Sequence, residues 1–380
     1  MKNKIFLTLI LVAMLLCSTV FPVIAKHTTI TGNSSNQQLS NASLNFIQTD
    51  LFIDGDADFI SKASSFSWPG SGTDGSPYQI FNYFMNKTNG VISIKNTDLH
   101  FQMYNVTSTT FGLVNVSNFV LSHNNGIVFL VINSSLGSLY YNYGHKFDIE
   151  GSKTLYVENN IAQIDSTNYG GYFGFLISNS SFMYLIQNYA SGYIDPNSSI
   201  IYDTGAFRFV NCLSSEFYDN TAFNSKTGFD VLDTNSSMFE RNTAVFSKTG
   251  FHLYNSNSNS IQTTIVSYLT VGFLVTHYST NNTINANVAV TSGGAFVNAS
   301  GLSIDGTCTG NTFNSNHFAE PITQKITETI TSSYTTTVTT TDTTTGSSSS
   351  SLSSFVSEFA ILSLFFVVFL RFKMRNKRLH

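Results

Sequence analysis

Three residues that can take part in proton transfer recur at a fixed interval in this sequence. Arg208, Asp230 and His252 stand 22 residues apart at each step, and each directly follows a phenylalanine. A carboxylate beside a basic residue and an imidazole can act in general acid and base catalysis. The same three groups can also stabilise neighbouring strands as a ladder of opposite charges. We favour the ladder, because no second carboxylate is expected in this column, and we keep the three residues as the candidates for catalysis.

A repeat of phenylalanines positions these residues. The interval is 22 residues in the middle of the chain, 23 at the last step, and 18, 18, 28 and 32 in the first part, where loops of different length would account for the change. Nine units result. The phenylalanines that open them are Phe111, Phe129, Phe147, Phe175, Phe207, Phe229, Phe251, Phe273 and Phe296.

Each unit has the same internal pattern. The residue two after the phenylalanine is apolar in eight units, and the residue between is often polar, which predicts a strand with alternating inward and outward side chains. A second apolar column lies ten residues after the phenylalanine, and asparagines recur four and thirteen residues after it. Asparagine tolerates left-handed turns, and stacked asparagines can hydrogen-bond between coils. The sequence therefore predicts an all-β fold, a single-stranded right-handed parallel β-helix of about nine coils with ~22 residues per coil.

The segment before the repeat resembles a known group of proteins. From Ile53 to Ile80 the chain is similar to the start of secreted β-helix proteins of the NosD-like type, also called the carbohydrate-binding and sugar-hydrolase (CASH) group. The residues that carry this resemblance are Trp68, Pro69, Gly70, Gly72, Thr73, Pro77 and Tyr78. The resemblance covers about residues 53–318 and implies a β-helix at a surface or in a periplasm, but it does not define an activity.

The two ends of the chain predict export and anchoring. An apolar run after Lys2 and Lys4 indicates a signal peptide, with an uncleaved anchor as the alternative. The Thr-rich stalk with its hydrophobic, basic end is similar to the anchors of archaeal surface proteins. We expect a single-pass protein of the cell surface with an extracellular N-terminal domain. The predicted regions are 1–25 signal peptide, 26–52 linker, 53–110 lead-in segment with the first coils or cap, 111–318 β-helix repeats, 319–353 Thr/Ser-rich stalk, 354–370 transmembrane helix and 371–380 basic cytoplasmic tail.

Composition and spacing argue against several other functions. The net charge is −4 and basic residues cluster only in the last ten positions, so we expect no nucleic-acid partner. No cofactor or metal is expected either. Asp54, Asp56 and Asp58 depart from a calcium loop at the glycine and glutamate positions, and favour a capped turn. Cys212 and Cys308 would lie four coils apart, too far for a disulfide.

The function that these observations favour is binding or coating at the cell surface, with glycans or other surface proteins as partners. Polar ladders and a group of tyrosines suit weak, repeated sugar contacts. A polysaccharide lyase or glycoside hydrolase is the main alternative, and a purely structural surface-layer role is the second. Asp219 and Arg241 predict another ladder pair, and Asn41 and Asn197 are the glycosylation candidates. The tyrosines are Tyr140, Tyr141, Tyr143, Tyr169 and Tyr172.

Overall fold

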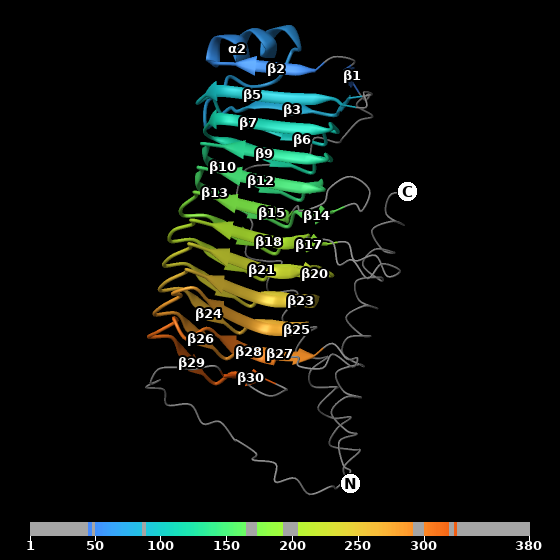
Figure 1. Ribbon diagram of the computed structural model, residues 1–380. Coiled ribbons are helices and arrows are strands. Elements are labelled where there is room, and N and C mark those ends of the chain that lie inside the picture. The colour runs from blue at the N-terminus through green and yellow to red at the C-terminus, as the bar shows by residue number, and fades with distance from the viewer. Residues whose placement is uncertain are drawn as a thin grey trace, which may run out of the picture. The chain divides into compact units, whose positions relative to one another are not determined.

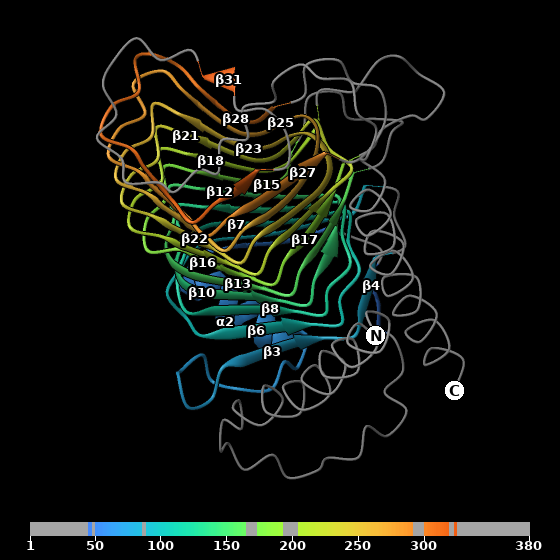
Figure 2. The ribbon, with the colours of Figure 1, turned by 90° about the horizontal axis from the view of Figure 1, so that it is seen from below.

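The computed structural model describes residues 45–47, 50–85, 89–164, 173–192, 204–291, 300–318 and 323–324. These residues form a stack of coils in which strands pair in parallel with those of the preceding and following coil (Figure 1). The predicted right-handed parallel β-helix is thereby confirmed. Viewed along the stack in Figure 2, strands β8, β10, β13 and β16 follow one side of each coil, and β12, β15 and β18 follow another.

Two large sheets and one small sheet make up the stack. The 11-stranded sheet consists of β3 (Tyr78–Phe81), β6 (Phe101–Tyr104), β8 (Phe119–Ser122), β10 (Ser135–Tyr140), β13 (Lys153–Glu158), β16 (Tyr184–Ile186), β19 (Glu216–Tyr218), β22 (Met238–Glu240), β24 (Ser260–Gln262), β26 (Thr283–Asn285) and β29 (Thr312–Asn314). The 18-stranded sheet consists of β2 (Leu51–Asp54), β5 (Val91–Thr97), β7 (Thr110–Val116), β9 (Val128–Ile132), β11 (Tyr143–Gly144), β12 (Lys146–Glu150), β14 (Ile161–Gln163), β15 (Phe173–Ser178), β17 (Tyr189–Ser191), β18 (Gly205–Val210), β20 (Thr221–Phe223), β21 (Thr227–Leu232), β23 (Thr243–Tyr254), β25 (Ile265–Thr276), β27 (Val288–Thr291), β28 (Ser300–Ile304), β30 (His317–Phe318) and β31 (Thr323–Gln324). The small sheet pairs β1 (Asn45–Ile47) with β4 (Tyr83–Met85).

The phenylalanine column forms the core. Successive rings stack nearly parallel, with centroids 4.7 Å apart for Phe111 and Phe129 and 5.0 Å apart for Phe207 and Phe229. The predicted last member is wrong, because Phe273 pairs with Leu302, and Phe296 lies outside the described residues. In the other direction, Ile92 and Leu51 continue the column before Phe111. The sequence interval missed these positions because aliphatic side chains fill them.

The two asparagine columns have different structural roles. The residues thirteen after the phenylalanine are buried, and Asn142 donates from Nδ2 to Oδ1 of Asn160 at 2.9 Å. The left-handed residue at this corner is the one before the asparagine, for example Tyr141 with φ 53°. The residues four after the phenylalanine do adopt the predicted left-handed conformation, for example Asn115 with φ 54°. The first column therefore supplies buried hydrogen bonds, and the second supplies turns.

Helix α2 (Asp56–Ser65) covers the N-terminal end of the stack. The capped turn predicted here is wrong, since Asp54 ends β2 and Asp56 and Asp58 lie in the first turn of the helix. Asp56 accepts a hydrogen bond from the Thr97 hydroxyl at 2.6 Å. Phe59 of this helix is fully buried and lies 5.3 Å from the Phe101 ring. The helix thus shields the apolar end of the stack from water.

The residues that carry the resemblance follow this helix, and Trp68 packs against Phe59 of the helix with ring centroids 5.8 Å apart. Trp68 donates from Nε1 to the Tyr83 hydroxyl at 2.6 Å. Gly70 has φ 109°, and a Cβ there would lie 2.1 Å from the carbonyl oxygen of Pro77, so only glycine fits.

Among the residues that the structure describes, no helix is long and apolar enough to cross a membrane. The predicted signal peptide (1–25) and transmembrane helix (354–370), like the stalk and tail, lie outside these residues.

Candidate functional site

The structure brings Arg208, Asp230 and His252 into one row. They lie on β18, β21 and β23, and the strand register pairs Arg208 with Asp230 and Asp230 with His252. Each phenylalanine before them points into the core, so the alternation of the strand turns these three side chains outward. The predicted alignment is confirmed.

Both oxygens of the Asp230 carboxylate are engaged. Arg208 donates to Oδ2 from Nε at 2.8 Å and from Nη2 at 2.6 Å. The Nδ1 atom of His252 lies 2.9 Å from Oδ1, and its Nε2 lies 3.1 Å from the Thr276 hydroxyl on the next coil. The row is therefore a continuous network of hydrogen bonds over four coils.

The outward position of these residues on the strand predicts an exposed ion pair. The Asp230 side chain is instead only 6% exposed, against 37% for Arg208. The guanidinium of Arg208 stacks 3.8 Å from the centre of the Phe173 ring. That ring occupies the space above Gly205, where a Cβ would lie 1.8 Å from a ring carbon. An aromatic side chain from the preceding coil thus holds the arginine over the carboxylate.

The pKa of Asp230 indicates which proton chemistry this row can perform. Burial raises the pKa, but the hydrogen bond from His252 and the charge of Arg208 outweigh it, and the pKa is lowered overall. The carboxylate therefore stays ionised near neutral pH and is a poor general acid. Because both of its oxygens are occupied, it is also a poor base.

A second carboxylate does share the column, contrary to expectation, but it lies far away. Asp148 is three coils from Asp230 in the strand register, with Leu176 and Arg208 between them. The distance is about 14 Å from the usual strand spacing. Paired carboxylates in glycosidases lie about 5–9.5 Å apart. Asp148 is instead paired with Lys146 at 2.7 Å, so the row lacks the acid pair that hydrolysis uses.

The second predicted ladder pair is confirmed. Arg241 donates to both carboxylate oxygens of Asp219 at 2.9 Å and to Glu240 at 2.6 Å. Asp219 and Arg241 both occupy left-handed positions at the corner of successive coils. The Arg241 side chain is half exposed, so this pair contributes little to stability.

The predicted tyrosines do not form one site. Tyr140 is half-buried and donates to Ser138, whereas Tyr141 is exposed at a turn and stacks on His123. Tyr143 begins the next strand and donates to Gln163. Tyr169 and Tyr172 lie outside the described residues, as do the glycosylation candidates Asn41 and Asn197.

A different pair of tyrosines, missed in the sequence, lies on the outer face of the 11-stranded sheet. Tyr156 on β13 and Tyr184 on β16 pair in register and stack with ring centroids 4.8 Å apart and 8° between the planes. Tyr156 is 43% exposed. The sequence contains a pattern that could have indicated this pair, because each tyrosine directly precedes a residue of the second apolar column, Val157 or Leu185.

Polar residues surround this pair. Glu216 pairs in register with Tyr184, and Glu158 lies two residues after Tyr156 on the same strand. Tyr218 donates to Glu216 at 2.9 Å. Burial and this carboxylate raise the pKa of Tyr218 to about 12, so its hydroxyl keeps its proton. We refer to Tyr140, Tyr156, Glu158, Tyr184, Glu216 and Tyr218 as the tyrosine face.

The structure offers no metal site within the residues it describes: no three His, Cys, Asp or Glu side chains come together there. Cys212 and Cys308 are both free thiols. Burial raises the pKa of Cys212 to about 12, so this thiol stays protonated and is unreactive.

Comparisons with known proteins support no assignment beyond the fold. No protein-family model matches the chain, and no curated protein matches it. Among solved structures, the chain is similar to the Dettilon tailspike protein at 10% identity, with a TM-score of 0.45 over 74% of this chain and 60% of that one. It is also similar to the periplasmic alginate epimerase AlgG (12% identity, TM-score 0.35, 76% and 82% covered) and to PfbA, a surface adhesin of Streptococcus pneumoniae (8%, 0.34, 66% and 76%).

Proposed function

We propose that this protein is a non-catalytic, extracellular binding protein that contacts neutral glycans through the tyrosine face. The observation that carries the proposal is the parallel stack of Tyr156, which is exposed, on the half-buried Tyr184 of the adjoining coil. Tyrosine supplies a large, rigid and partly polar contact surface at low entropic cost, which suits the apolar face and hydroxyl rim of a sugar ring.

The charges on this face favour a neutral ligand. Glu158 and Glu216 flank the tyrosines and can accept hydrogen bonds from sugar hydroxyls. The same carboxylates would repel the acidic sugars on which lyases act. Together with the occupied Asp230 carboxylate, this arrangement supports binding over the alternative of a polysaccharide lyase or hydrolase.

Attachment to the cell surface is part of the proposal. It rests on the apolar segment 354–370 with the basic residues that follow it. Deleting residues 354–380 should move the protein from the membrane fraction to the medium. Retention of the truncated chain in the membrane would contradict the anchor.

A glycan array with the full-length protein tests the binding function. We expect retention on neutral glycans, lowered at least about tenfold when Tyr156→Ala and Tyr184→Ala are combined, because two stacking contacts are lost. Tyr141→Ala is the matched control, since this exposed tyrosine lies outside the face.

Three results would contradict the proposal. Release of new reducing ends from a bound glycan indicates an enzyme. Retention that is unchanged in the double variant places the binding elsewhere. Absence of retention on any glycan, with a surface protein captured through the same tyrosines, assigns the face to a protein partner.

A further inference from the structure

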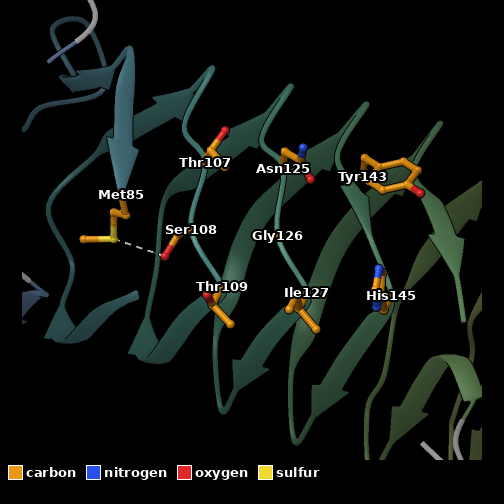
Figure 3. Close-up of a pocket in the computed structure, with 9 residues that line it drawn as sticks. All are labelled: Met85, Thr107, Ser108, Thr109, Asn125, Gly126, Ile127, Tyr143 and His145. Carbon is orange, nitrogen blue, oxygen red and sulfur yellow. Dashed lines mark hydrogen bonds between the residues drawn. The ribbon is translucent and has the colours of Figure 1, made fainter. Parts of the chain in front are cut away.

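A concave surface lies in the segments that precede β7, β9 and β12, where the coils are shortest. It is a groove of about 230 Å³ that crosses three coils (Figure 3). One wall consists of Thr107, Asn125 and Tyr143, which are bridged to one another in register. The other wall and the floor consist of Thr109, Ile127 and His145, and of Met85, Ser108 and Gly126.

The backbone explains why a groove forms here. In each of these coils the chain bends at a small inward-facing residue, and the side chains before and after it both point outward. At Gly126 a Cβ would lie 2.8 Å from the Phe111 ring, so a larger residue there would displace this ring. The Ser108 hydroxyl is held by Met85 Sδ at 3.2 Å and by the Gly90 carbonyl at 2.9 Å, which fixes the end of the floor.

The lining predicts the chemistry of a ligand. The nine described residues that line the groove include no Asp, Glu, Lys or Arg, so a charged ligand would find no opposite charge among them. Tyr143 is 39% exposed and offers a ring face, and Asn125 offers an exposed amide.

The size of the groove limits the ligand further. Pockets for drug-sized molecules enclose about 300–1,000 Å³, and this groove is smaller. We propose that it binds one neutral pyranose ring, stacked on Tyr143 and hydrogen-bonded to Asn125. The class of ligand rests on the proposed glycan-binding function, but the groove and the tyrosine face share no residue and can be tested separately.

Saturation-transfer NMR on the full-length protein tests this site, with the methyl glycosides of glucose, galactose, mannose and N-acetylglucosamine as probes. We expect one of the four to bind at millimolar concentration. Tyr143→Ala should weaken its binding about fivefold through loss of one stacking contact. Ile127→Trp should abolish binding by filling the groove. Tyr156→Ala is the control and should leave the affinity unchanged.

Any other outcome contradicts the inference that the groove binds a sugar. No binding by any of the four glycosides, or equal binding in wild type, Tyr143→Ala and Ile127→Trp, removes the site. Binding that is lost only in Tyr156→Ala places the sugar on the tyrosine face, so the groove inference fails while the proposed function stands. Circular dichroism of each variant confirms that the β-sheet content is unchanged.

Discussion

The coils of 18 residues and the coils of 22 residues share the same phenylalanine core but differ in the segment that leads to it. Both stack a phenylalanine from coil to coil, as Phe111 does with Phe129 and Phe229 with Phe251. They differ in the segment between the corner, which we define as the column of Gly144 and Ala222, and the next phenylalanine. Gly144 stands three residues before Phe147, whereas Ala222, in the same column, stands seven before Phe229. The four extra residues account for the whole difference in coil length.

The extra residues change the structure of the corner. In the long coils they form a further turn with a left-handed residue, Asn224 or Phe246, and a buried hydrogen bond between Ser225 and Ser247 at 3.0 Å. In the short coils the chain bends at once and leaves the groove open. The charged row of Asp230 occurs only in the long coils. A difference of four residues in one segment therefore separates a corner with an open groove from a corner that is filled by a further turn.

The largest effect should come from the core that both kinds of coil share. Phe229→Asp places an unpaired charge in a fully buried column, which costs several kcal/mol. We expect loss of the cooperative thermal transition, and the same result for Phe129→Asp in a short coil. Phe229→Leu is the control and should remain folded. Native stability in either aspartate variant would contradict an internal phenylalanine column.

Two glycines should distinguish the two kinds of coil more finely, Gly228 in β21 of a long coil and Gly126 at the bend of a short coil. At Gly228 a Cβ would lie 2.6 Å from the Gly250 carbonyl oxygen and 2.7 Å from Cβ of Ala244, so backbone has to move. At Gly126 the nearest atoms belong to the Phe111 ring, which can shift. We expect Gly228→Ala to cost about 2–3 kcal/mol and Gly126→Ala about 1 kcal/mol in urea unfolding. The reverse order would show that the short coil is the more tightly packed.

A smaller effect than that of Gly228→Ala is expected in the row on the long coils. Because Asp230 is buried, Asp230→Asn should lower stability by about 1–2 kcal/mol at pH 7, more than an exposed pair would, and leave glycan binding unchanged. A loss of glycan binding with an unchanged melting temperature would instead make Asp230 a ligand contact.

The pH dependence follows from the lowered pKa of Asp230. A depressed folded pKa gives stability that is present above the unfolded pKa, about 3.9, and is lost as the pH falls through the folded pKa. The difference in melting temperature between wild type and Asp230→Asn should therefore be full at pH 7 and shrink below about pH 4. A difference that stays constant down to pH 2 would show that ionisation of Asp230 does not stabilise the fold.

The sequence by itself determined the coil, its core and the alignment of the row. In a parallel coil every position stacks on the same position of the next turn, so a column such as Phe207, Phe229 and Phe251 is visible as a period. The buried asparagines, the left-handed asparagines and the neighbours Arg208 and Asp230 could be predicted for the same reason. The ends of the phenylalanine column could not, because Leu302 and Ile92 replace the aromatic residue and an insertion changes the interval.

Only the tertiary structure decided which outward residues are buried and which surfaces are concave. The burial of Asp230 depends on the Phe173 ring, which lies over Gly205 and supports Arg208. Tyr156 and Tyr184 are 28 residues apart in sequence, and only the register through an insertion stacks them. The period of a sequence reports which residues lie above one another along the stack. It does not report how far the chain bends within a coil, and that bend sets the groove and the exposure of each side chain.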